Sequence, residues 1–133
     1  VTLGEFLHDL QHFGKLNPLV VSQALNMMND YQINWRIIEH QPAIDVQWTA
    51  LRLSMIILLG CCNYELIILD EPTFGLGWQQ KQMLARFINK ILNKKHCIII
   101  SHDGQFIRSI CDKILELDSK SIIQNPSLIR EQR

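Results

Sequence analysis

The 133-residue sequence lacks an excess of either charge and has no long hydrophobic run. Its 13 basic and 13 acidic residues cancel, whereas a dedicated nucleic-acid-binding domain is expected to be strongly basic. Its longest apolar run, Met55–Cys62, is eight residues long, and a transmembrane helix needs roughly 18–20. We interpret this run as the buried face of a helix. We therefore expect no nucleic-acid partner and no transmembrane segment.

Sorting signals and paired cysteines are also missing. The N-terminal residues do not show the basic and then apolar pattern of a signal peptide, which favours a cytoplasmic protein. Cys61, Cys62, Cys97 and Cys111 occur without C-x-x-C spacing. Reduced, buried side chains explain these four cysteines better than disulfides or a metal site. The length allows one modest domain with its own core.

The first 45 residues have the spacing of helices. Thr2 and Glu5 form a capping-box pattern at the start of one helix. Apolar residues at helical spacing predict a second helix over about 20–31 and a short third element over 33–38. We expect a helical subdomain over residues 1–45.

From residue 46 helical and strand patterns alternate, and a tail follows over 125–133. The alternation predicts an α/β domain over 46–124, with a parallel sheet and right-handed crossovers. The predicted elements are a helix over 48–59 closed by Gly60, a strand over 65–69, a helix over 78–92, a strand over 97–100, a helix over 105–111, a strand over 114–117 and a last short strand over 121–123.

Two isoleucine-rich runs end in polar side chains. Leu66–Leu69 is followed by Asp70 and Glu71, and Cys97–Ile100 is followed by Ser101 and then His102. Such runs are typical of buried parallel strands, and ligands bind at the carboxyl ends of these strands. We expect the two carboxylates and the imidazole to lie at neighbouring strand ends, where they could hold a hard cation and activate water.

These side chains suit the hydrolysis of a nucleoside triphosphate. Asp70 can reach Mg²⁺, which takes one or two protein carboxylates alongside substrate phosphates. Glu71 can accept a proton from an attacking water, and His102 can stabilise charge that develops on the terminal phosphate. Alone, each is more often a solvated turn or a structural side chain. Their combination in this order favours descent from a nucleotide hydrolase.

The run Leu66-Ile67-Ile68-Leu69-Asp70-Glu71-Pro72-Thr73 resembles the Walker B strand of ABC-type ATPases, and Ser101-His102-Asp103 resembles their switch-histidine loop. The strand Ile114-Leu115-Glu116-Leu117-Asp118 also resembles the C-terminal layout of that family. The resemblance covers about residues 46–124. It implies a partial P-loop NTPase-type parallel sheet with flanking helices, preceded by a helical subdomain that would face a membrane partner.

The resemblance also implies ATP and Mg²⁺ as cofactors and a role for each candidate residue. Asp70 would be the metal ligand, Glu71 the general base and His102 the sensor of the γ-phosphate. No residue of this sequence is assigned to holding the nucleotide, because no G-x-x-x-x-G-K-[ST] loop occurs in it.

Two further departures affect the surface that would serve a partner's nucleotide. The family's Leu-Ser-Gly-Gly-Gln signature is replaced by Val46–Ala50, where Trp48 and Thr49 put side chains in place of glycines. The Asp that contacts the opposite subunit is replaced by Gly77. We therefore expect the isolated chain not to hydrolyse ATP.

The missing phosphate loop would precede the helical subdomain, and the chain begins with Val close to where that subdomain would start. A fragment, a split gene product or a degenerate paralogue would each give this sequence. Without the missing part, the strands would expose unpaired edges and apolar faces. We expect the isolated chain to be poorly stable or to associate.

The leading hypothesis is the C-terminal portion of an ABC transporter ATP-binding subunit at the cytoplasmic side of the membrane. Its partners would be a membrane permease subunit and either a second ATPase subunit or the missing N-terminal half. One alternative is a soluble ribosome-associated ABC protein, because the motif of that branch is similar to Ser101-His102-Asp103-Gly104-Gln105-Phe106. Another is a non-catalytic interaction module that kept the fold but lost the phosphate site.

Overall fold

Helices form most of the structure in the computed structural model, which describes residues 1–92, 94–117 and 121–124. The predicted tail, 125–133, lies outside these ranges. The elements are α1 (Leu3–His12), α2 (Pro18–Asp30), α3 (Trp35–Ile38), a 3₁₀ turn (Ala43–Asp45), α4 (Trp48–Cys61), β1 (Leu66–Asp70), α5 (Trp78–Leu92), β2 (His96–Ile100), α6 (Gly104–Ile110), β3 (Lys113–Glu116) and β4 (Ser121–Gln124).

Local capping sets where the first two helices begin. The Thr2 hydroxyl accepts a hydrogen bond from the Glu5 N–H at 3.1 Å, and the Glu5 carboxylate accepts one from the Thr2 N–H at 2.8 Å. This confirms the predicted capping box. Helix α2 starts two residues earlier than predicted, because the Asn17 side chain caps it and Pro18 suits its first position.

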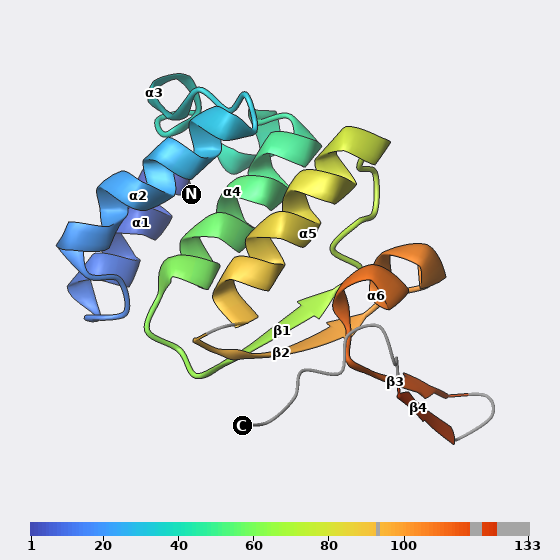
Figure 1. The fold of residues 1–133 in the computed structure, drawn as a ribbon. Helices are drawn as coiled ribbons and strands as arrows, with labels where there is room; N and C mark the ends of the chain where they lie inside the picture. Colours follow the sequence, from blue (N-terminus) through green and yellow to red (C-terminus); the bar gives the residue numbers. More distant parts are fainter. Residues whose placement is uncertain (93, 118–120, 125–133) are drawn as a thin grey trace.

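The elements stack in layers (Figure 1). α4 and α5 lie side by side over one face of the β1–β2 sheet, and α1 and α2 pack on α4 from the side away from the sheet. Leu3 and Leu10 of α1 share one hydrophobic core with Leu53 and Ile57 of α4. The core is therefore continuous across residue 45, where the sequence predicts the end of a helical subdomain.

The helices and the cysteines can be compared with the sequence expectations. In the part of the chain that the structure describes, no helix has both the length and the apolar character needed to cross a bilayer. The four cysteines are free, with Cys62 buried and the others partly buried. Burial raises the pKa of the Cys97 thiol to about 11, so this thiol stays protonated near neutral pH.

The sequence predicts that Gly60 ends the helix after Leu59. In the structure Gly60 instead lies inside the last turn of α4. A Cβ atom on Gly60 would come within 2.5 Å of Phe87 Cζ on α5. Glycine is therefore needed here so that α4 and α5 can approach closely. The sequence prediction is wrong because the reason for this glycine lies on a helix that follows it by 27 residues.

The strand β1 is buried on one face and not on both, as its isoleucine-rich run alone would indicate, and its other face is apolar and exposed, as the sequence predicts for strands that lack part of their sheet. Ile67 and Leu69 are buried and belong to the hydrophobic core. On the opposite face Ile68 is 60% exposed and its neighbour in register on β2, Ile98, is 50% exposed. Helices cover a single face of this sheet in the described structure, so alternate isoleucines face outwards.

The strand predicted over 114–117 does not join the parallel sheet. Only β1 and β2 pair in parallel among the described strands, whereas β3 pairs with β4 in a separate antiparallel sheet. The short connection between β3 and β4 explains why these two strands are antiparallel to each other, because a parallel pair would need a crossover of a dozen or more residues. The predicted strand over 121–123 is confirmed as β4, although as one side of this hairpin.

We predict that Gly60→Ala lowers the free energy of unfolding. Crowding against Phe87 costs about 1–3 kcal/mol, and over most of this range the cost is larger than the ~1 kcal/mol that alanine gains over glycine inside a helix. Chemical denaturation measures the change. The double variant Gly60→Ala/Phe87→Leu should lose less stability than the sum of the losses of the two single variants. Gly77→Ala is the control, since its Cβ would meet only Gln80 Oε1 at 3.7 Å. A Gly60→Ala variant as stable as the wild type would contradict this packing.

We also predict that the purified chain associates through the outward face of the β1–β2 sheet. Replacing Ile68 and Ile98 together by Thr should shift the chain towards monomer in analytical ultracentrifugation, because Thr keeps the β-branched shape and removes apolar surface. The matched control makes the same replacement at Ile37 and Ile44, which are at least as exposed as Ile98 but lie outside the sheet. A wild-type chain that is a monodisperse monomer with a sharp thermal transition would refute the prediction.

Candidate functional site

The site begins where β1 ends and the chain turns at Glu71. The Glu71 N–H donates to the Ile100 carbonyl at 2.7 Å, which extends the pairing with β2 by one bond. The Glu71 backbone then adopts φ +47°. This left-handed conformation costs a non-glycine residue on the order of 1–3 kcal/mol and persists only where the surroundings enforce it.

Hydrogen bonds to the Glu71 carbonyl hold this turn in place. It accepts hydrogen bonds from the Phe74 N–H at 3.2 Å and from the Arg52 guanidinium of α4. Arg52 also donates to the Phe74 carbonyl at 3.5 Å. The turn after β1 is thus tied both to itself and to the preceding helix.

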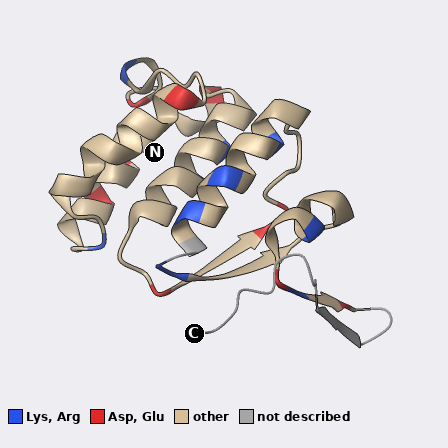
Figure 2. Cartoon of the chain, viewed as in Figure 1, with Lys and Arg blue, Asp and Glu red and all other residues tan. Residues whose placement is uncertain are grey.

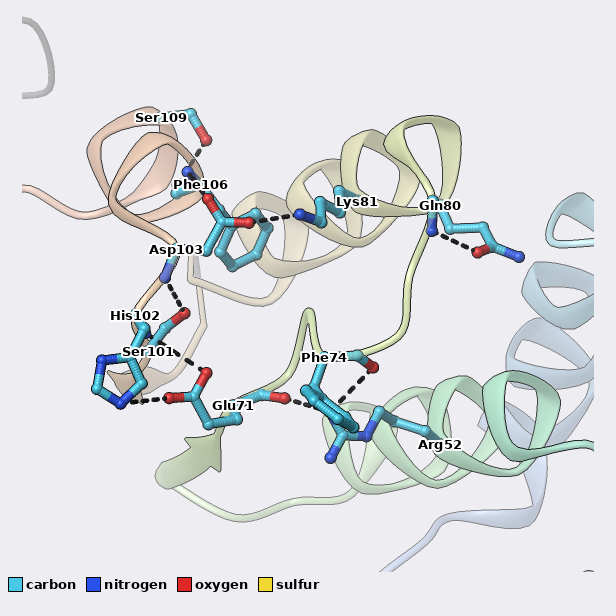
Figure 3. Close-up of polar contacts among 11 residues, drawn as sticks. Arg52, Glu71, Phe74, Gln80, Lys81, Ser101, His102, Asp103, Phe106 and Ser109 are labelled. Atoms are coloured by element: carbon cyan, nitrogen blue, oxygen red, sulfur yellow. Dashed lines mark hydrogen bonds and ion pairs between the residues drawn. The ribbon is translucent and has the colours of Figure 1, made fainter.

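Glu71 and His102 meet, as the sequence predicts (Figure 3). Glu71 Oε1 lies 3.4 Å from His102 Nε2, and Glu71 Oε2 accepts the His102 backbone N–H, also at 3.4 Å. The Glu71 side chain is 33% exposed and the His102 side chain is 100% exposed. A half-buried proton acceptor therefore stands beside an imidazole that is open to a ligand.

Asp70 is exposed at the last position of β1, on the outward face of the sheet that also carries Ile68. Within the described ranges, no three His, Cys, Asp or Glu side chains gather into a group that could hold a metal ion by themselves. Asp70 does fit as one ligand of Mg²⁺, because the ion needs few protein carboxylates when phosphate oxygens complete its shell. The structure thus brings Glu71 and His102 into contact, whereas the Asp70 carboxylate lies exposed on the outward face of the sheet.

Asp103 fixes the loop on the other side of His102. Its carboxylate accepts the Phe106 N–H at 3.1 Å and caps α6, and its own N–H donates to the Ser101 hydroxyl at 3.0 Å. Lys81 of α5 lies 2.7 Å from Asp103 Oδ2. The hydrogen bond from Lys81, followed by that from Phe106, lowers the pKa of the Asp103 carboxyl below its ordinary value. Asp103 is therefore ionised near neutral pH and keeps His102 anchored to α5 and α6.

Sequence reasoning missed two cations of this site, Arg52 and Lys81. α5 carries Lys and Arg but no Asp or Glu, and acidic residues lie at the end of β1 (Figure 2). Asp103 could have been found from its N-cap position before a short helix. The sequence gives a weak signal for Arg52, four residues after Trp48 on the same helix, and none for Lys81, because its partner comes 22 residues later.

Gly77 makes a capping contact at the start of α5. Its N–H donates to the Gln80 side chain at 2.9 Å. The space around a Cβ atom at this position is open apart from that side chain. The fold therefore does not require glycine where the ABC pattern has Asp.

Relatives with curated descriptions match the chain over only part of their own length. The chain is 38% identical over 64 residues to an ABC transporter ATP-binding protein of Treponema denticola, covering 47% of this chain and 13% of that protein. It is 27% identical over 94 residues to the energy-coupling factor transporter ATP-binding protein EcfA2 of Staphylococcus aureus, covering 69% of this chain and 33% of that protein. The chain thus spans a third or less of these relatives.

Solved structures share the fold at low sequence identity. A bacterial ABC transporter cassette solved as a dimer matches with a TM-score of 0.73 and 17% identity, covering 94% of this chain and 57% of that chain. An archaeal ribosome recycling factor, solved with a ribosomal stalk protein, matches with a TM-score of 0.63 and 17% identity over 91% of this chain and 23% of that chain. No protein-family model matches the chain.

The relatives are ABC-type ATP-binding proteins, and the structural neighbours have the P-loop NTPase fold of ABC cassettes. The helices and small parallel sheet agree with the predicted partial α/β domain. In sequence and in fold, the chain matches the C-terminal part of an ABC ATPase domain.

Proposed function

We propose that this chain is the C-terminal portion of an ABC transporter ATP-binding subunit and supplies half of its hydrolytic site. The observation that carries the proposal is the contact of the Glu71 carboxylate with His102, at 3.4 Å to both the imidazole and the backbone N–H. A carboxylate and a histidine that follow two neighbouring parallel strands meet at the edge where α/β sheets bind ligands.

Each residue would have one task. Glu71 accepts the proton of the attacking water at its carboxylate. His102, held by its backbone to Glu71 and exposed at its ring, donates to a terminal phosphate oxygen and stabilises developing charge. Asp70 would hold Mg²⁺, which neutralises phosphate charge when bound. These are the Walker B and switch-histidine roles that the resemblance implies.

Partners complete the proposal. The sequence contains no G-x-x-x-x-G-K-[ST] loop to hold the β- and γ-phosphates, and the chain covers 57% of the dimeric cassette. The phosphate loop would come from an N-terminal half or a second ATPase subunit, and a membrane permease would use the energy. The chain by itself would release no phosphate from ATP.

Two other functions have specific support. The ribosome recycling factor is a structural neighbour, which favours a soluble ribosome-associated protein as the second candidate. The altered signature window and Gly77 favour a non-catalytic module. Because space for a side chain remains at Gly77, restoring the Asp tests the latter: Gly77→Asp should strengthen pairing with an ATPase subunit if that surface is still used.

We predict that Glu71→Gln lowers ATP turnover by about 10²-fold or more, because glutamine cannot take the proton from water. The measurement is phosphate release and retention of ATP by the complete subunit, assembled from this chain and the part that supplies the phosphate loop. ATP should remain trapped in the variant.

The matched control is Glu65→Gln, which makes the same chemical change at an exposed residue just before β1. Its turnover should equal that of the wild type. Unchanged turnover in Glu71→Gln would refute the assignment of the base. Phosphate release by the purified chain alone would refute the need for a partner.

A further inference from the structure

We infer that Arg52 is a positioning residue that holds Glu71 in its left-handed turn and so aims the carboxylate at His102. This inference rests on the proposed function, since it concerns the same base. Arg52 is half-buried on α4, and its guanidinium donates to the Glu71 carbonyl. Figure 3 shows Arg52 on the carbonyl side of Glu71 and His102 on its carboxylate side.

Arg52 is itself held in place by two aromatic rings. Its Cζ atom lies 5.1 Å from the Trp48 ring centroid and 5.9 Å from the Phe74 ring centroid. Cations within about 6 Å of an aromatic ring are attracted by its electron-rich face. Trp48 comes one helical turn before Arg52, and Phe74 belongs to the turn that Arg52 binds. The guanidinium is therefore fixed between the helix and the turn.

This arrangement transmits the rigidity of α4 to the base. The residue after Arg52, Leu53, is fully buried in the core, so the helix cannot easily shift. The planar guanidinium reaches the carbonyls of both Glu71 and Phe74, the first and last residues of a tight turn. With this brace the positive φ of Glu71 is the stable conformation. Without it, Glu71 can relax towards ordinary backbone angles, which swings its side chain away from His102.

The same contacts give a structural role to the tryptophan at position 48. Trp48 stands in the window where the ABC signature has glycines, and its ring lies close to Arg52 and to the position of a Cβ on Gly75, at 3.6 Å. Gly75 has φ +77°, a conformation that glycine permits, and a Cβ there would make only an ordinary van der Waals contact with the Trp48 ring. The altered signature therefore packs on the turn of its own chain.

The test uses the backbone N–H and ring signals of His102 in the purified chain, followed by NMR with ¹⁵N-labelled histidine. Arg52→Met should move both signals towards their positions in Glu71→Gln, because each variant removes the carboxylate from His102. Arg52→Lys keeps a donor to the carbonyls and should return the signals most of the way to wild type. Arg36→Met, which removes an exposed cation on α3, should leave them unchanged.

In the complete subunit, Arg52→Met should lower kcat by roughly 10- to 100-fold with little change in KM, as expected when a reacting group is misplaced. Unchanged His102 signals in Arg52→Met, with a lower melting temperature only, would overturn the positioning role and leave the base assignment standing. Full turnover in Glu71→Gln with shifted His102 signals in Arg52→Met would instead overturn the proposed function alone.

Discussion

The register between β1 and β2 is the constraint on which the candidate site depends. Asp70 lies opposite Ile100, so the residues that follow both strands leave the sheet at the same level. The Glu71 N–H to Ile100 carbonyl bond of 2.7 Å extends this register into the turn. A slip by one residue would exchange the faces of the strand and bury Ile68 and Asp70 in place of Ile67 and Leu69. The contact between Glu71 and His102 would then be lost, because it needs both strands to end together.

The same short sheet explains why a chain with a well-packed core has an exposed apolar face. α4 and α5 bury one face of β1 and β2, and the paired Ile68 and Ile98 occupy the other. In an antiparallel sheet that faces water, these positions would be polar. Isoleucines on both faces are typical of a parallel strand that is covered on two sides. The apolar outward face is thus in keeping with a chain that matches only part of an ABC cassette.

Features that depend on nearby residues could be predicted, and features that depend on distant contacts could not. The apolar period of α5 and the capping pattern at Thr2 are local, so the sequence predicts them with their bounds. The Glu71–His102 contact was predictable as well, because parallel strands align their carboxyl ends. Gly60 depends on Phe87 of another helix, and the antiparallel direction of β3 depends on the short connection to β4. The spacing of apolar residues along the sequence indicates neither the contact of Gly60 with Phe87 nor the pairing of β3 with β4.

Trp48, in contact with Arg52, shows how a departure from a family pattern can be consistent with retention of Glu71, the base that we propose. A signature built of glycines leaves its surface free for a nucleotide held by another subunit, whereas Trp48 covers part of that surface and contacts Arg52. Arg52 in turn supports the backbone of Glu71, which must adopt a costly left-handed angle to face His102. On the proposed function, the side chain that reduces what this chain can offer to a partner's nucleotide also stabilises the base used for its own.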